Sequence, residues 1–211
     1  MSSPVGSGRS ATTPARPQRP AVFLDRDGTV VEFVDYLCDP AQVRLIPRAG
    51  EALRRLREAG YACVLVTNQS GVGRGWFPES AVDSVHDELA GRLAAVGAAL
   101  DAVYYCPAAP PPTGPRDDPD RKPNPGMLLR AANDLNLDLR ASWMIGDSLS
   151  DVQAGLNAGC RGSILVQTGK FAPPSDGDPR WATVLDLLAA AELILDLGAR
   201  GTTHELGTNG C

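Results

Sequence analysis

The sequence predicts an α/β fold with an open, mostly parallel sheet and helices on both of its faces. Two observations lead to this prediction. Short apolar runs alternate along the chain with segments whose apolar residues recur at helical spacing, and polar residues gather where the apolar runs end. The 211 residues, 43% of them apolar, suit one domain with a full hydrophobic core.

The first strand and the first helix have the clearest patterns. Residues 21–25, AVFLD, are a short apolar run that ends in an aspartate, and such runs are covered on both faces in a parallel sheet. Residues 47–60 then place Ala49, Leu53 and Leu56 at helical spacing, with a proline at the start and a glycine past the end. A strand followed by a helix is therefore the predicted unit.

This unit repeats down the chain. We expect further strands at residues 61–67, 101–106, 141–147 and 163–168, and further helices at residues 78–98, 125–136 and 150–159, before an apolar segment at 181–197.

Both ends of the chain differ from this pattern. Residues 1–19 and 199–211 have too few apolar side chains to offset the entropy of ordering, so we expect flexible tails around a domain at 20–198. A transit peptide is an alternative for the first tail, since Arg and Ser are present and acids are absent, but no amphipathic helical pattern supports it.

Composition limits the partners and the compartment. The net charge of -5 comes with scattered Lys and Arg, which form no basic stripe for a nucleic acid, and no apolar run reaches the roughly 18 residues of a membrane span. The five cysteines include no C-x-x-C pair, and most lie in or beside apolar runs, as free thiols do in a reducing compartment. We expect a soluble, cytoplasmic protein without nucleic-acid or membrane partners, and we favour a monomer.

Acidic side chains follow two of the predicted strands. Ligands of open parallel sheets bind at the carboxyl ends of the strands, so we expect Asp25, Asp27 and Asp147 to share one crevice. Three carboxylates repel one another unless a hard cation with oxygen ligands neutralises them, which favours Mg²⁺ over Zn²⁺. Lys122, in a loop before a predicted helix, can supply the opposing positive charge.

Four segments, FLDRDGTV, VLVTNQSG, RKPNPGML and MIGDSLSD, follow one another between residue 21 and about residue 170. Together they resemble the four motifs of the haloacid dehalogenase superfamily of phosphohydrolases. The sequence is more closely similar to the small capless branch that contains the D-glycero-D-manno-heptose 1,7-bisphosphate 7-phosphatases and the histidinol-phosphate phosphatases. The resemblance implies a Rossmann-like domain without a large cap, and phosphatase activity.

The resemblance also implies the catalytic roles. Asp25 would be the nucleophile that forms an aspartyl-phosphate, and Asp27 would act as the general acid and base. Residues i and i+2 of a strand share a face, which fits the spacing of this pair. Thr67 and Lys122 would stabilise the charge of the transferring phosphoryl group.

Metal and substrate residues follow from the same resemblance. Asp25, the backbone carbonyl of Asp27 and Asp147 would hold Mg²⁺, with Asp151 in a supporting role. The residues expected to contact the substrate are Arg26, Asp35, Tyr36, Asn68, Gln69, Ser70, Arg121 and Ser148.

One departure from the branch concerns zinc. Its zinc-binding members carry C-x-H after the third strand and C-x-C before the Arg-Lys pair, a closed four-ligand site. Here Cys106 is kept, but Ala108 stands at the histidine position, and Asp118 and Asp120 stand at the cysteine positions. One thiolate with two carboxylates is a poor structural zinc site, so we predict that zinc is absent.

The substrate is less well defined, because the loops that set specificity in a capless enzyme differ from the familiar forms. The motif RKPNPGMLL favours removal of the 7-phosphate of D-glycero-D-manno-heptose 1,7-bisphosphate. Histidinol phosphate, an amino alcohol phosphate, or a broader range of small sugar phosphates is the alternative. An inactive sugar-phosphate-binding module also stays open, since fold does not fix function, although the intact acids argue against it. His86 lies among charged residues of a predicted helix and is expected to be exposed.

Overall fold

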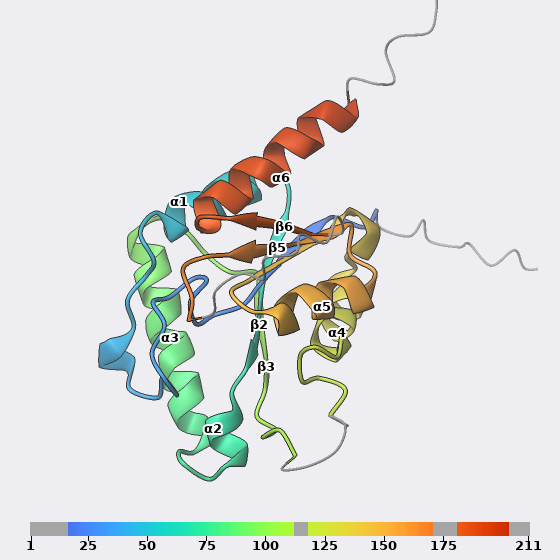
Figure 1. Ribbon diagram of the computed structural model, residues 1–211. Coiled ribbons are helices and arrows are strands. Elements are labelled where there is room, and N and C mark those ends of the chain that lie inside the picture. Colours follow the sequence, from blue (N-terminus) through green and yellow to red (C-terminus); the bar gives the residue numbers. More distant parts are fainter. Residues whose placement is uncertain (1–16, 112–117, 171–180, 203–211) are drawn as a thin grey trace, which may run out of the picture.

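Strands and helices alternate along the chain, as the sequence predicts. The computed structural model describes residues 17–111, 118–170 and 181–202, and side chains as far as residue 199 (Figure 1). The strands are β1 (Ala21–Leu24), β2 (Ala62–Asn68), β3 (Ala102–Cys106), β4 (Trp143–Gly146), β5 (Gly162–Val166) and β6 (Trp181–Val184). The helices are α1 (Ala49–Glu58), α2 (Ser70–Gly73), α3 (Glu79–Ala95), α4 (Gly126–Leu135), α5 (Leu149–Ala158) and α6 (Leu187–Thr202), with 3-10 turns η1 (Pro40–Gln42) and η2 (Leu139–Ala141).

The described strands form one parallel sheet in the order β3-β2-β1-β4-β5-β6. The chain runs outward from β1 through β2 to β3 and then continues on the other side of β1 with β4. β1 and β4 are therefore neighbours at the switch point, where ligands bind in open sheets. The predicted open, parallel α/β fold is confirmed.

The side chains of β1 alternate between two hydrophobic cores. Val22 and Leu24 pack with residues of α1, α3 and α6, whereas Ala21 and Phe23 pack with residues of α4 and α5. All four side chains are fully buried. Figure 1 shows the two groups of helices on opposite sides of the sheet. Because both faces are covered, β1 has a continuous apolar sequence and not an alternating one.

The expected apolar segment at 181–197 divides into two elements. β6 is an additional edge strand that pairs with β5, and α6 follows after a two-residue connection. Asp186 Oδ1 accepts a hydrogen bond from Ala189 N at 2.8 Å, which satisfies one of the amides at the start of α6. This cap marks the start of α6 within one apolar stretch.

The described domain extends slightly past its expected bounds. Gln18 Nε2 donates to the carbonyl of Leu137 at 3.4 Å, Arg19 pairs with Asp101 at 2.8 Å, and α6 runs to Thr202. Residues 1–16 and 203–211 lie outside the described residues, so the flexible tails stay a prediction.

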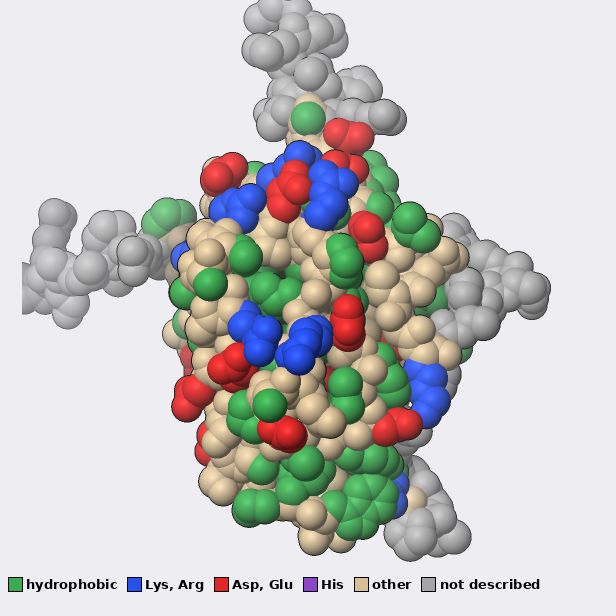
Figure 2. Space-filling view, turned by 90° about the vertical axis from the view of Figure 1, so that its left-hand side faces the viewer, with side chains coloured by type: hydrophobic (Ala, Val, Ile, Leu, Met, Phe, Trp, Pro, Cys, Tyr) green, Lys and Arg blue, Asp and Glu red, His purple; other side chains and the backbone are tan. Residues whose placement is uncertain are grey.

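Surface and helix properties bear on the expected partners. Acidic and basic side chains are interspersed on the face shown in Figure 2, which has no continuous basic surface. Within the described ranges, every helix is too short or too polar to cross a bilayer.

Candidate active site

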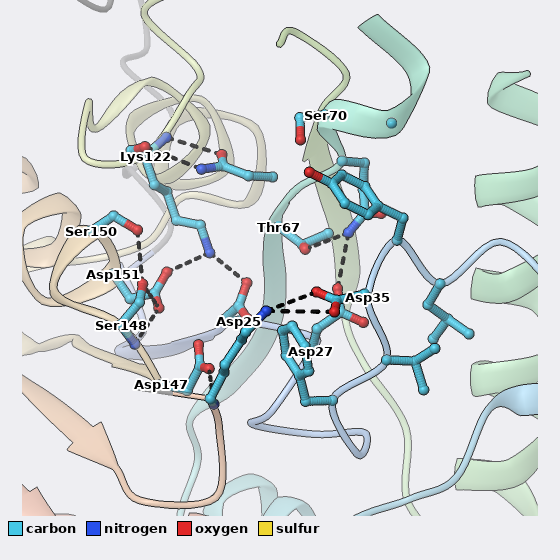
Figure 3. Close-up of a pocket in the computed structure, with 18 residues that line it drawn as sticks. Asp25, Asp27, Asp35, Thr67, Ser70, Lys122, Asp147, Ser148, Ser150 and Asp151 are labelled. Carbon is cyan, nitrogen blue, oxygen red and sulfur yellow. Dashed lines mark hydrogen bonds and ion pairs between the residues drawn. The ribbon is translucent and has the colours of Figure 1, made fainter. Parts of the chain in front are cut away.

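A cavity of about 270 Å³ opens at the carboxyl ends of β1, β2 and β4 (Figure 3). Its walls come from the loops that follow these strands and β5, and from the loop before α4. The residues assigned to the site from the sequence that line this cavity are Asp25, Asp27, Asp35, Tyr36, Thr67, Asn68, Gln69, Ser70, Lys122, Asp147, Ser148 and Asp151. The structure therefore brings together all of the assigned residues except Arg26 and Arg121.

The buried residues Asp25, Lys122, Asp147 and Asp151 form the floor of the cavity. Lys122 is 1% exposed. Its ammonium group lies 2.6 Å from Asp25 Oδ1, 2.6 Å from Asp151 Oδ1 and 2.7 Å from the carbonyl oxygen of Val66. Three acceptors match the three N–H groups of an ammonium. Although burial disfavours the charged amine, the carboxylates of Asp151 and Asp25 raise the pKa of Lys122 above its usual value. A fixed positive charge therefore lies beside Asp25.

Asp25, Asp147 and Asp151 form a buried acidic cluster. One carboxylate oxygen of each lies within 4.8 Å of the others. Burial raises the pKa of Asp25 to about 7, against the opposing charge of Lys122, and burial together with Asp151 raises the pKa of Asp147 to about 6. Both shifts reflect negative charge that water does not solvate, and a divalent cation would relieve it. Since all donors are oxygens, the cluster fits Mg²⁺.

Asp151 also organises the start of α5. Its Oδ2 accepts hydrogen bonds from Ser148 N at 3.0 Å and Ser148 Oγ at 2.6 Å, while its Oδ1 holds Lys122. Both oxygens of Asp151 thus have protein partners. This arrangement fits a residue that supports Lys122 more than one that binds the metal directly.

A second network holds Asp27 from behind the cavity. The guanidinium of Arg26, which is fully buried, donates from Nη2 to Asp27 Oδ2 at 3.0 Å and to Gln69 Oε1 at 2.9 Å. Gln69 Nε2 in turn donates to Thr67 Oγ1 at 2.9 Å and to Asp27 Oδ2 at 3.2 Å. The network fixes the carboxylate of Asp27 and the hydroxyl of Thr67 relative to each other.

His86 of α3 completes this network, which corrects the expectation that it is exposed. Its Nε2 lies 3.2 Å from Nη1 of Arg26, and the ring is half-buried. Burial and the charge of Arg26 lower the pKa of His86 to about 4. Because the guanidinium can only donate, Nε2 of a neutral His86 accepts this hydrogen bond.

Asn68 fixes the backbone of the loop that carries Lys122. Its Oδ1 accepts from Lys122 N and its Nδ2 donates to Lys122 O, both at 3.1 Å. This two-point amide contact ties the end of β2 to the lysine loop.

The loop after β5 closes tightly over the acids. Thr168 Oγ1 donates to the carbonyl of Gly28 at 2.6 Å, and a Cβ at Gly169 would lie only 1.9 Å from Asp147 Oδ2. Gly28 itself has φ of 77°, a left-handed conformation that permits the sharp turn after β1. Glycine at position 169 is therefore required for the approach of this loop to Asp147.

Two of the residues expected to contact the substrate lie elsewhere. The resemblance assigns Arg26 to substrate contact, but its guanidinium is buried and donates to Asp27 and Gln69. Arg121 donates from Nη1 to the carbonyl of Ala108 at 2.7 Å, so it braces the lysine loop against the segment after β3. Neither belongs to the described cavity wall.

The segment expected to lack zinc has other bonding. Cys106 is buried in the core of the α4 and α5 face, Asp118 Oδ1 accepts from Asp120 N at 2.9 Å, and Asp120 pairs with Arg130. Residues 112–117, between them, lie outside the described residues, and the absence of zinc stays a prediction.

Sequence reasoning missed Lys170 and Phe33, which also line the cavity. Lys170 Nζ pairs with Asp35 Oδ1 at 3.1 Å and lies 5.3 Å from the centre of the Phe33 ring. Lys170 follows the predicted strand at 163–168, so the rule that placed polar residues at strand ends in one crevice applies to it as well.

The fold and this cavity define a class of protein, the haloacid dehalogenase-like phosphatases. Residues 120–191 match the family model described as HAD-hydrolase-like. This chain belongs to the haloacid dehalogenase superfamily and is a phosphatase of that superfamily.

Its relatives point to a particular branch. The chain is 44% identical over 178 residues to the D-glycero-D-manno-heptose-1,7-bisphosphate 7-phosphatase of Thermosynechococcus vestitus, covering 81% of this chain and 90% of the relative. It is 42% identical over 173 residues to the D-glycero-beta-D-manno-heptose-1,7-bisphosphate 7-phosphatase of Yersinia pestis, covering 81% and 92%. The D,D-heptose 1,7-bisphosphate phosphatase of B. bronchiseptica, solved with magnesium and phosphate, is 35% identical with a TM-score of 0.71, covering 84% of this chain and 99% of that chain.

Proposed function

We propose that this phosphatase removes the 7-phosphate of D-glycero-D-manno-heptose 1,7-bisphosphate through an aspartyl-phosphate on Asp25, with Mg²⁺ as its cofactor. The observation that carries the chemistry is the meeting of Asp25, Lys122 and Asp147 on the floor of one cavity, with Asp27 in its wall. The names of the relatives at 44% and 42% identity support the choice of substrate.

In the first step, an oxygen of Asp25 attacks phosphorus and the bond from phosphorus to the ester oxygen breaks. Lys122 holds Oδ1 of Asp25, which leaves Oδ2 for the attack. Asp27 donates a proton to the departing alkoxide, and Lys122 and Thr67 offset the charge on the transferring oxygens.

In the second step, water attacks the phosphorus of the aspartyl-phosphate. Asp27, now ionised, accepts a proton from this water, and the bond from phosphorus to Asp25 breaks to release inorganic phosphate. Arg26 and Gln69, which donate to Oδ2 of Asp27 at 3.0 Å and 3.2 Å, hold this carboxyl group in place for the step. The same carboxyl group therefore serves both steps and returns to its starting state.

The acidic cluster would hold the metal through Asp25 and Asp147, with the Asp27 carbonyl as a further ligand. Bound there, Mg²⁺ would offset the carboxylate charge that otherwise repels a phosphate dianion.

The test measures phosphate release from heptose 1,7-bisphosphate, histidinol phosphate and a panel of sugar monophosphates, with and without Mg²⁺. We expect Mg²⁺-dependent turnover with preference for the bisphosphate, and loss of turnover in Asp25→Asn. When wild-type turnover is quenched with acid, mass spectrometry should find phosphate on the peptide that contains Asp25, and Asp27→Asn should slow both the formation and the hydrolysis of this intermediate.

Several outcomes would contradict the proposal. Preference for histidinol phosphate would replace the substrate, and equal activity in Asp25→Asn would refute the nucleophile. No turnover of any phosphate ester would favour an inactive binding module. We also propose that the enzyme is a zinc-free monomer, which metal analysis of the purified protein and its sedimentation in solution test directly.

A further inference from the structure

Lysine is rare in this chain and concentrated at one place. Only two of its 20 basic residues are lysines, Lys122 and Lys170, and both line the same cavity. Lysine carries a compact charge that suits a phosphate oxygen as well as a carboxylate. The mechanism uses Lys122 and leaves the second lysine without a task.

The two lysines differ in how firmly they are held. Lys122 is buried, and three acceptors surround its ammonium. The side chain of Lys170 is 53% exposed, and that of its partner Asp35 is 67% exposed. An exposed ion pair of this kind contributes little to stability, so its exchange for another anion costs little.

Lys170 also connects the floor of the cavity with its mouth, the solvent-exposed part where Lys170 pairs with Asp35. Its backbone N lies 3.4 Å from Oδ2 of Asp147, while its ammonium reaches Asp35 on the loop after β1. In Figure 3 two dashed lines mark the contacts that reach Asp35, on the far side of the cavity from Lys122. The ammonium group therefore lies one lysine side chain away from the metal ligand.

We propose that Lys170 binds the second phosphate of the substrate, the one that is not hydrolysed, and that this phosphate displaces Asp35 from the lysine. The inference rests on the proposed function and deepens it, because it makes the cavity selective for sugars that are phosphorylated at two positions. A phosphate dianion carries more charge than the carboxylate that it displaces, and the released Asp35 is solvated by water.

Charge in the cavity supports this assignment. Its described wall holds five carboxylates, Asp25, Asp27, Asp35, Asp147 and Asp151, against the two lysines. The reacting phosphate would meet Lys122 and the metal. Lys170 is the other cation of this wall, so a second phosphate has one counter-ion there, at the mouth.

The test compares two substrates that differ only in the second phosphate. Steady-state kinetics with heptose 1,7-bisphosphate and with heptose 7-phosphate give the ratio of their kcat/KM values. In Lys170→Met we expect this ratio to fall by about 10- to 100-fold, mainly through the KM of the bisphosphate, since a contact between two charged groups is lost. Lys170→Arg should keep most of the ratio.

One further variant, Arg140→Met, is the control, and another, Asp35→Asn, tests the exchange itself. Arg140→Met removes one exposed positive charge from η2, which precedes β4 and so lies at the opposite end of the strands from the cavity, and should leave the ratio unchanged. Asp35→Asn removes the competing carboxylate, so the KM of the bisphosphate should stay equal or fall.

The outcomes separate this inference from the proposed function. An equal loss with both substrates in Lys170→Met, or no change in the ratio, would overturn the role of Lys170 while wild-type turnover upholds the phosphatase. A KM that rises in Asp35→Asn as it does in Lys170→Met would show that the ion pair itself organises the mouth, and would overturn the exchange. Absence of wild-type turnover on both substrates would contradict the proposed function first.

Discussion

The floor and the mouth of the cavity use the same chemical pair in opposite ways. On the floor, Lys122 meets Asp25 and Asp151, and all three side chains are largely buried; at the mouth, Lys170 meets Asp35 in contact with solvent. The buried pair fixes charges where a bond must form, and it cannot lose a partner without leaving an uncompensated charge. The exposed pair can open at small cost. Under the two proposals above, burial separates the residues that would act on phosphorus from those that would select the substrate.

The largest expected difference comes from removing each lysine in turn. Lys122→Met leaves buried carboxylates without their counter-ion, so we expect the free energy of unfolding to fall by about 3–5 kcal/mol and kcat to fall by at least about 10²-fold. Lys170→Met should change the free energy of unfolding by less than about 0.5 kcal/mol. Urea unfolding and phosphate release measure both quantities. A similar fall in the free energy of unfolding in both variants would contradict the claim that the buried pair stabilises the protein and the exposed pair does not.

Adding a single methyl group next to Asp147 should also weaken the binding of Mg²⁺. In Gly169→Ala the new Cβ would meet Asp147 Oδ2 at 1.9 Å, so the carboxylate must shift. We expect the affinity for Mg²⁺ to fall by about 10- to 100-fold, as happens when the support of a metal ligand is disturbed. Calorimetric titration with Mg²⁺ measures this. Gly91→Ala in α3, where nothing lies within 4 Å of the new Cβ, is the matched control and should bind Mg²⁺ as wild type does.

The network behind Asp27 should have a smaller effect. Gln69→Leu removes the hydrogen bonds that join Thr67, Asp27 and Arg26, and we expect kcat to fall by about tenfold with little change in KM. Gln153→Leu, an exposed change on α5, is the control. A rise in KM with kcat unchanged would mean that Gln69 binds substrate and does not position the acid.

The smallest expected effect concerns pH. The pKa of Asp25 is raised from 3.8 to about 7, so the stability that its protonated form provides is present below about pH 4 and is lost as pH rises through about 7. The metal-free protein should therefore be less stable at pH 8 than at pH 5. Binding of Mg²⁺ should accordingly raise its stability more at pH 8 than at pH 5. We expect Mg²⁺ to raise Tm by several degrees at pH 8 and by less than about 2 °C at pH 5. Scanning calorimetry measures this, and an equal rise at both values of pH would contradict the assignment of the charge to the floor.

Much of the fold follows from local sequence patterns. The predicted strands at 21–25, 61–67, 141–147 and 163–168 are followed by polar residues that meet in the cavity, because parallel strands place their carboxyl ends at one edge of the sheet. The sequence pattern does not separate β6 from α6, since only Leu185 and Asp186 stand between the two elements and the whole stretch reads as one apolar segment. The cap at Asp186 was a readable signal for this boundary.

Side-chain direction was harder to predict than position. The spacing of Asp25 and Asp27 places them on one face of a strand, but it does not reveal that Arg26 between them folds back toward His86, 60 residues later in the sequence. That contact depends on how α3 packs against the sheet, which local pattern does not encode. The resemblance to a family assigned a role to Lys122. The strand-end rule applies to Lys170 as well, but only the structure shows that Lys170 pairs with Asp35.

The scarcity of lysine makes selective chemical labelling of the cavity possible. The amine of Lys122 is buried and held as an ammonium ion, so Lys170 is the one accessible side-chain amine in the chain. Amine-directed reagents, fluorophores or immobilisation chemistry would therefore attach at the entrance of the active site, apart from the α-amino group. Labelling through lysine would report on occupancy of the mouth, and for the same reason it should not be used to tether the enzyme for assays.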